Sequence, residues 1–72
     1  MSSDTPLLPL PIPRDRRHYR LAMGVTLKQA ASQLGVSARQ YLRWEQGATP
    51  SPGNHRKYSA QLEEWKREIH SA

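Results

Sequence analysis

Apolar residues in the middle of the chain recur with the spacing of a helix face. Four residues follow the pattern i, i+3, i+4, i+7: Leu27, Ala30, Ala31 and Leu34. This pattern gives a helix one apolar side about two turns long. Thr26 comes directly before it and Gln29 three residues later, as in a capping box. Gly35 is suited to end the helix, because glycine readily adopts the left-handed backbone of a C-terminal cap.

Similar signals predict a helix on each side of this one. Upstream, a helix over about residues 16–23 has Asp15 as its expected N-cap and Gly24 as its stop. Downstream, Ser37 is the expected N-cap of a helix over residues 38–46.

A last helix is predicted over about residues 53–70. Ser51 followed by Pro52 makes a good pair of N-cap and first helical residue. The helix carries an apolar stripe at i, i+4, i+7, i+11: Tyr58, Leu62, Trp65 and Ile69. The predicted fold class is therefore all-α, with four helices.

The N-terminal segment differs from the rest of the chain. Residues 1–13 hold four prolines between positions 6 and 13, which exclude a regular helix or an inner strand there. We expect a disordered, proline-rich arm of polyproline II character. This arm is either a dispensable tail or a segment that lies on DNA or on a partner. Residues 14–72 then form the only domain, because 72 residues leave no room for a second fold.

Composition excludes several classes of protein. The chain has no cysteine, which excludes a disulfide framework and a thiolate metal site. No apolar run approaches the roughly 18 residues that a membrane-spanning helix needs, and no basic residue precedes the N-terminal leucines as in a signal peptide. The histidines are scattered, without a nucleophile–base pattern. We therefore expect no enzyme activity, no cofactor, no metal, no small-molecule ligand, no membrane association and a cytoplasmic location.

The charge distribution indicates a nucleic-acid partner. The net charge is +5, with 11 Lys and Arg against 6 Asp and Glu. Nine basic and two acidic side chains fall within residues 14–57, whereas the flanking segments are each slightly acidic. A basic surface concentrated on one part of a small domain is typical of a protein that binds phosphate backbones.

Two short helices joined by a glycine-containing turn describe a helix-turn-helix, here over residues 26–47. Four segments at their mutual spacings resemble the Cro/phage-repressor family of Xre-type helix-turn-helix domains: Gly24-Val25-Thr26, Ala30-Ala31, Leu34-Gly35-Val36-Ser37 and Trp44-Glu45-Gln46-Gly47.

The resemblance implies that residues 38–46 form the recognition helix of a DNA-binding transcriptional regulator. The base-reading positions of the family correspond to Ala38, Arg39 and Arg43. Both arginines can fork onto O6 and N7 of guanine, and the Ala38 methyl suits a thymine methyl. Gln40 lies on a neighbouring face and can reach a base or a phosphate.

The resemblance also implies a buried ion pair between Arg20 and Glu45. At the first residue of the second helix the family commonly has a glutamine that binds phosphate, but this chain has Leu27. Phosphate contacts must then come from elsewhere, and we assign them to five residues: Arg17, Lys28, Ser37, Arg56 and Lys57.

The length predicts a dimer. The family usually has five helices, whereas this chain has room for four. One recognition helix reads about half of a site, which is too little for specificity alone. We therefore expect a homodimer on palindromic double-stranded DNA, acting as a Cro-like, phage-type repressor. Trp65 and Ile69 are the expected dimer contact, while Tyr58 and Leu62 complete the core.

Two other interpretations stay open. The run Gly53-Asn54-His55-Arg56-Lys57-Tyr58, followed by Leu62 and Trp65, resembles a segment of MerR-type and excisionase winged helices, which are architectural DNA-binding factors. In that family the His-Arg-Lys-Tyr run ends a β-hairpin wing that touches the DNA backbone. Pro50 and Pro52 disfavour a β-hairpin wing over residues 48–57, because each removes a hydrogen-bond donor. Alternatively, the chain is a protein-interaction module that binds a host protein, with residues 7–13 as a linear ligand motif.

Overall fold

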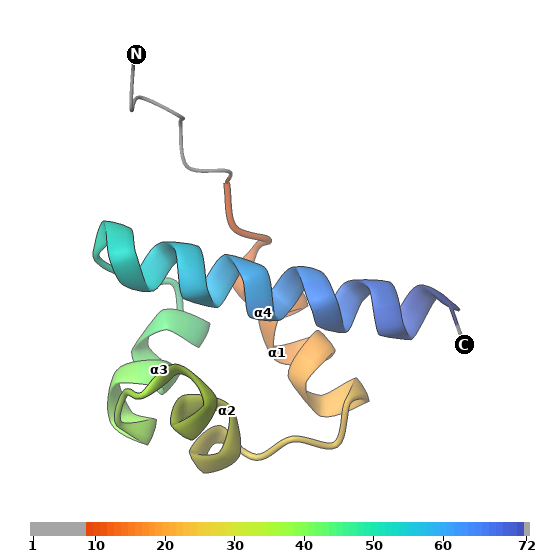
Figure 1. Cartoon of the computed structure of the whole chain (residues 1–72), viewed down its shortest axis with the longest axis horizontal. Helices are drawn as coiled ribbons and strands as arrows, with labels where there is room; N and C mark the ends of the chain where they lie inside the picture. The colour runs from red at the N-terminus through yellow and green to blue at the C-terminus, as the bar shows by residue number, and fades with distance from the viewer. Residues whose placement is uncertain (1–8, 72) are drawn as a thin grey trace.

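The computed structural model describes residues 9–71, which form four helices and no strand (Figure 1). In chain order these are α1 (Pro13–Ala22), α2 (Leu27–Leu34), α3 (Ala38–Glu45) and α4 (Pro52–Ser71). The 20-residue α4 packs against α1 and α2, and α3 packs against α1 and α2. The predicted all-α class is confirmed. No helix in this part of the chain is long and apolar enough to cross a membrane.

The two central helices are delimited by the residues that their sequence signals indicate. Oγ1 of Thr26 accepts a hydrogen bond from the backbone N–H of Gln29 at 3.0 Å, and Oε1 of Gln29 accepts from the N–H of Thr26 at 2.9 Å. Gly35 ends α2 with a φ of 73°, in the left-handed region. Oγ of Ser37 caps α3 by accepting from the N–H of Gln40 at 3.1 Å. These short-range predictions are confirmed because caps depend on neighbours in sequence.

The start of α1 differs from the prediction. The helix begins at Pro13, with Ile12 as its N-cap, and Asp15 lies within the first turn. Proline is well suited to the first helical position, because its missing N–H would have no partner there. Asp15 as N-cap is therefore wrong. Its carboxylate still lies near the positive end of the helix dipole, where a negative charge is favourable.

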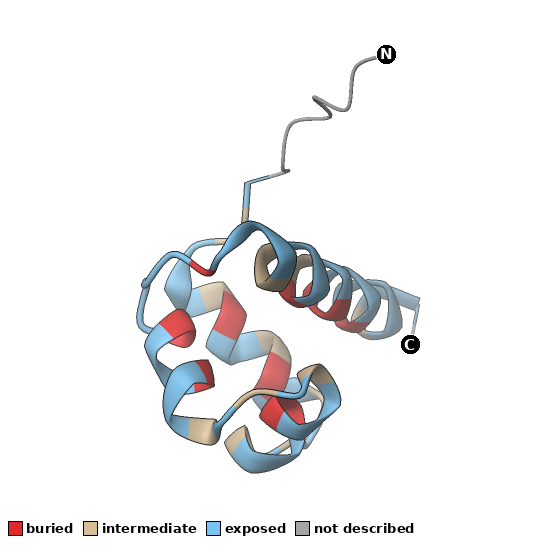
Figure 2. Ribbon diagram, turned by 60° about the vertical axis from the view of Figure 1, so that its left-hand side comes forward, coloured by how far each residue is buried: buried red, intermediate tan, exposed pale blue. Residues whose placement is uncertain are grey.

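The core is small and dominated by aromatic side chains. Its buried members come from α2, α3 and α4: Ala30, Ala31, Tyr41, Trp44, Tyr58, Leu62 and Trp65. In Figure 2 the buried positions lie on the faces that the helices turn toward one another. The ring of Tyr58 lies 5.1 Å from that of Tyr41 and 5.4 Å from that of Trp44, between centroids. These separations fall in the favourable range for tilted and edge-on aromatic pairs.

Trp65 belongs to the core of its own chain. Its exposed fraction is 5%, and that of Leu62 is 1%. The prediction that Trp65 contacts a second copy of the chain is therefore wrong, because its side chain packs inside its own domain. Ile69, one turn further along α4, is half-buried. The apolar stripe of α4 thus faces the other helices at least as far as Trp65.

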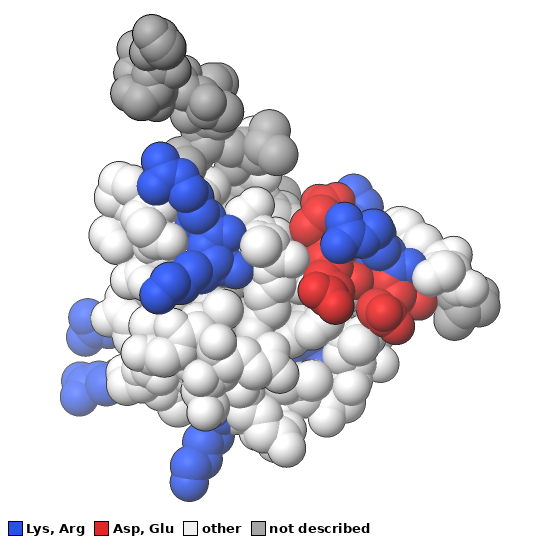
Figure 3. All heavy atoms as spheres, in the orientation of Figure 1, with Lys and Arg blue, Asp and Glu red and all other residues white. Residues whose placement is uncertain are grey.

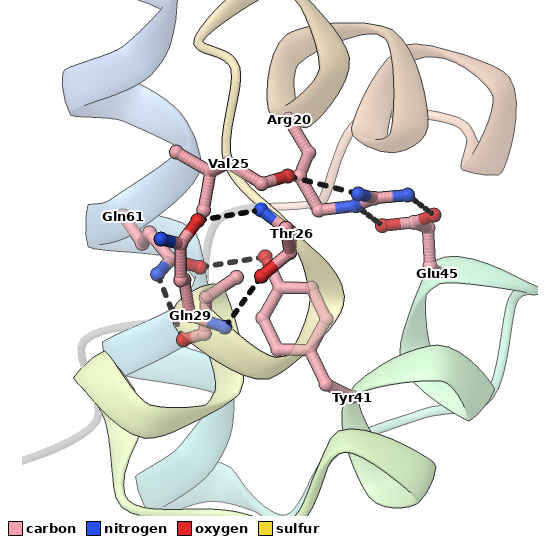
Figure 4. Close-up of polar contacts among 8 residues, drawn as sticks. Arg20, Val25, Thr26, Gln29, Tyr41, Glu45 and Gln61 are labelled. Atoms are coloured by element: carbon pink, nitrogen blue, oxygen red, sulfur yellow. Dashed lines mark hydrogen bonds and ion pairs between the residues drawn. The ribbon is translucent and has the colours of Figure 1, made fainter.

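Gln61 joins three helices through one buried amide (Figure 4). Its Oε1 accepts a hydrogen bond from the hydroxyl of Tyr41 on α3 at 2.7 Å. Its Nε2 donates to the carbonyl of Ala30 at 3.2 Å and to Oε1 of Gln33 at 2.9 Å, both on α2. Buried polar groups are costly unless they are paired. This network therefore selects one arrangement of α2, α3 and α4.

Burial keeps both core tyrosines protonated. Loss of solvent around its hydroxyl raises the pKa of Tyr58 to about 12. The same effect raises the pKa of Tyr41 further still, with an added contribution from Tyr58. Burial penalises the phenolate and leaves the neutral phenol almost unaffected. The donor in the bond from Tyr41 to Gln61 is therefore present across the neutral pH range.

The arm predicted over residues 1–13 extends too far toward the C-terminus. Residues 1–8 lie outside the described residues. Leu10 packs against the core, and the carbonyl of Pro11 accepts a hydrogen bond from Nε of Arg16 at 2.6 Å. Pro13 already belongs to α1. Residues 9–12 therefore lie on the domain.

The structure contradicts a wing after α3. Residues 48–51 form a short loop, and residues 52–57 are the first turns of α4. Pro50 is buried in the loop, while Pro52 is the first residue of the helix. Proline cannot donate to a strand ladder, yet it fits the first turn of a helix. The winged-helix interpretation is therefore wrong for this chain.

Removing the hydroxyl of Tyr41 will destabilise the domain. Tyr41→Phe leaves Oε1 of Gln61 buried without its donor, and we expect the free energy of unfolding to fall by about 1–2 kcal/mol. Urea unfolding followed by circular dichroism measures this loss. Tyr19→Phe is the matched control, because Tyr19 is half-buried and outside the network. Equal unfolding midpoints for the two variants would contradict a stabilising role for the network.

Candidate nucleic-acid interface

The helix-turn-helix unit is formed by α2, a turn at residues 35–37, and α3. Ala30 and Ala31 are fully buried at the side of α2 that faces its neighbours, where their small side chains permit close approach. In the turn, the N–H of Val36 donates to the carbonyl of Ala31 at 3.0 Å. The left-handed Gly35 precedes it and redirects the chain. The turn thereby sets α3 at an angle to α2, with one face of α3 exposed.

A buried ion pair holds α3 to α1. Nε of Arg20 donates to Oε2 of Glu45 at 2.7 Å, and Nη2 donates to Oε1 at 3.0 Å. The two side chains are 10% and 4% exposed. The hydrogen bond with Glu45 raises the pKa of Arg20 above its already high usual value. The structure therefore contains the pair that the sequence resemblance implies, in the two-pronged form that fixes both position and orientation.

The same guanidinium also reaches the chain before α2. Nη1 of Arg20 donates to the carbonyl of Val25 at 2.9 Å (Figure 4). Val25 directly precedes the N-cap Thr26, so this bond ties the start of α2 to α1. One arginine thus links α1, the beginning of α2 and the end of α3.

A second buried arginine was missed by sequence reasoning. Arg16 is 9% exposed, and its Nη1 donates to the carbonyl of Trp44 at 2.6 Å while its Nε donates to that of Pro11. It therefore contacts the last turn of α3, where carbonyls lack helical partners. The only sequence signal is its i, i+4 spacing from Arg20, which places both on one side of α1. Neither arginine is free for a phosphate.

The outward face of α3 carries the predicted base-reading arginines. Tyr41 and Trp44 are fully buried on the inner face, and the helical period places Arg39, Arg43 and Gln46 on the opposite side. All three are exposed. This juxtaposition puts two guanidinium groups side by side at i, i+4 on the surface of α3.

Two other predicted base-reading residues lie beside this face. Gln40 is exposed, and its backbone N–H is occupied by the cap of Ser37. Ala38 is half-buried and packs against the core, so only part of its methyl faces outward. Leu42 on α3 and the C-cap residue Gln46 are exposed and were not among the predicted residues.

The five residues predicted to contact phosphates are all exposed, and they lie on α1, α2, α4 and the N-cap of α3. Arg17 lies on α1, Lys28 on the first turn of α2, and Arg56 and Lys57 on the early turns of α4. Ser37 uses its oxygen to cap α3, which leaves its O–H free to donate to a phosphate. Arg56 and Lys57 thus occupy a helix, where the rival interpretation expected a wing.

The charges are unevenly distributed over the molecule. In Figure 3, basic side chains project at the edge where α2 and α3 lie, whereas acidic and basic side chains lie together over the C-terminal half of α4. The acidic residues there are Glu63, Glu64 and Glu68, all exposed. Because Lys66 and Arg67 lie beside these glutamates, this end of α4 is close to neutral, and the surface of α2 and α3 attracts phosphates more strongly.

The comparison with known families agrees with this arrangement. Residues 17–63 match the family model described as helix-turn-helix. The chain belongs to the Xre/Cro-type helix-turn-helix family. No curated protein and no solved structure matches it. Members of this family are sequence-specific regulators that bind double-stranded DNA, and the family is not an enzymatic one.

Glu45→Gln will destabilise the domain, because the Arg20 guanidinium stays buried while its counter-charge is removed. Loss of one partner of a buried pair costs about 3 kcal/mol. Thermal unfolding followed by circular dichroism measures this effect. The matched control is Glu64→Gln on the exposed side of α4, which we expect to leave the melting temperature nearly unchanged. A melting temperature of Glu45→Gln equal to that of the control would show that the pair contributes no net stability.

Proposed function

We propose that this helix-turn-helix protein is a Cro-like repressor that places α3 in the major groove of its operator. The observation that carries the proposal is the exposed pair Arg39 and Arg43 on a helix whose opposite face is buried. The major groove admits an α-helix, and an arginine fork matches O6 and N7 of guanine. Each of the two arginines then reads one guanine, and Gln40 reaches a neighbouring base or phosphate.

Rigid support of α3 favours readout of bases over a loose charge attraction. Base-edge hydrogen bonds require side chains held in register with the groove, whereas phosphate attraction tolerates movement. Arg20 and Glu45 tie α3 to α1, and the bond from Tyr41 to Gln61 ties it to α4. The surrounding phosphate contacts come from five residues: Arg17, Lys28, Ser37, Arg56 and Lys57.

We further propose that two copies bind a palindromic site. One α3 of eight residues spans few base pairs, and two-fold symmetry doubles the site that is read. Because Trp65 packs in the core, the candidate contact between copies is the end of α4 with the half-buried Ile69. A dimer that covers an operator represses by excluding other proteins from that DNA.

Selection of bound sequences from a random duplex pool tests this function. We expect enrichment of a palindrome with guanines in each half-site, at a spacing of about 10 base pairs or a multiple of it. Enrichment of a single, non-repeated half-site would contradict the dimer. Absence of duplex binding even at low salt would contradict the DNA-binding function and favour a module that binds a host protein.

Arg39→Ala and Arg43→Ala will each weaken binding to the selected site by about 1–3 kcal/mol and relax specificity at one base pair. Lys28→Ala will instead weaken binding to all sequences and reduce the salt dependence by about one phosphate. Fluorescence anisotropy with specific and scrambled duplexes separates the two effects. Arg67→Ala, exposed on the C-terminal half of α4, is the matched arginine control. An equal loss on both duplexes would make Arg39 or Arg43 a phosphate contact.

A further inference from the structure

Leu42 is an exposed apolar side chain on an otherwise polar helix face. Its exposed fraction is 37%, and among the described large hydrophobic residues only Ile12 and Leu21 are also classed as exposed. Neither of those two lies on α3. Leu42 follows Arg39 by one helical turn and directly precedes Arg43. Exposure of a leucine to water is unfavourable in the free protein, and a ligand that covers the side chain removes this cost.

A second leucine lies in the same cleft. The cleft has a volume of about 470 Å³ and lies between α1, the start of α2 and the side of α3 that holds Leu42 and Glu45. Its lining includes Arg14, Arg17, Leu27, Leu42 and Gln46, together with the paired Arg20 and Glu45. Leu27 is half-buried and also packs against the core, so its position is fixed. Leu27 and Leu42 together form an apolar strip. Arg14 and Arg17, both exposed, add positive charge to the same cleft.

The surroundings of the apolar strip identify its occupant. Arg39 and Arg43 adjoin Leu42 on α3. The cleft adds two exposed arginines, Arg14 and Arg17, while its third arginine, Arg20, is paired with Glu45. A polyanion with an apolar group within reach of guanine edges fits this combination. In the major groove of duplex DNA, that apolar group is the C5 methyl of thymine. An apolar peptide would fit the two leucines but leave the arginines without partners.

We propose that Leu42, supported by Leu27, recognises the C5 methyl of a thymine next to a guanine read by Arg39 or Arg43. This proposal rests on the proposed function and names the base-pair sequence that α3 prefers. Leucine forms no hydrogen bond, so it discriminates only by the apolar surface that it covers. Burial of one methyl corresponds to about a fourfold change in affinity.

Replacement of thymine by deoxyuridine tests the assignment, since deoxyuridine lacks only the methyl and pairs identically with adenine. Each thymine of the selected duplex is replaced in turn, symmetrically in both half-sites, and binding to the full-length protein is measured by anisotropy. We expect one position at which the wild-type protein loses about fourfold in affinity per half-site. With Leu42→Ala, the loss at that position should disappear.

Two controls make the result specific to Leu42. Leu21→Ala removes an exposed leucine from α1, outside the cleft, and should retain the full thymine preference. Leu42→Met keeps an apolar side chain of similar volume and should retain most of it. Circular dichroism melts of all variants report folding, and the deoxyuridine scan of the wild-type protein needs no variant.

The outcomes separate this inference from the proposed function. If no sequence is enriched from the random pool, both are wrong. If a palindrome is enriched but no deoxyuridine replacement weakens binding of the wild-type protein, the proposed function holds and the thymine readout is wrong. If Leu42→Ala discriminates thymine from deoxyuridine as strongly as the wild-type protein does, another residue recognises the methyl and the assignment to Leu42 is wrong.

Discussion

The buried ion pair between Arg20 and Glu45 is the interaction on which the arrangement of this domain depends. Desolvation of two charges is costly, and only complete pairing offsets it. The guanidinium meets this requirement with two bonds to the carboxylate and a third to the carbonyl of Val25. Because these partners lie on α3 and just before α2, satisfying one charge positions three elements. The placement of α3 is thus coupled to the stability of the fold.

Two other buried polar side chains, Arg16 and Gln61, also join separate elements, so that the small apolar core does not orient the helices alone. Seven buried hydrophobic residues hold the described domain together, without disulfides. Arg16 binds the end of α3 and residue 11, and Gln61 joins α2, α3 and α4. Apolar packing tolerates small rotations of a helix, whereas a hydrogen bond loses most of its strength when it is misaligned. These bonds therefore give orientation to helices that burial alone would only bring together.

The division of the basic residues follows from this architecture. Arg16 and Arg20 act inside the domain, while Arg39 and Arg43 lie on its surface, although all four look alike in the sequence. The net positive charge of residues 14–57 therefore exceeds the positive charge that is exposed to phosphates. Leucines divide in the same way, since Leu62 is buried and Leu42 is exposed beside the surface arginines. For both residue types, the position on a helix face decides whether the side chain lies in the core or on the surface.

Much of this protein follows from short-range signals in its sequence. Three local signals predict α2 and the start of α3 closely: the capping box of Thr26 and Gln29, the stop at Gly35 and the cap of Ser37. Helix ends depend on neighbouring residues, so such signals can be read from the sequence. Family resemblance added the partner of Arg20, which no local pattern specifies. Tertiary structure alone decided that Trp65 belongs to the core, that Arg16 is buried and that residues 9–12 lie on the domain. Each of these features depends on contacts between residues that lie far apart in the sequence. Such contacts form only when the whole domain folds, because their free energy depends on the final packing of all four helices.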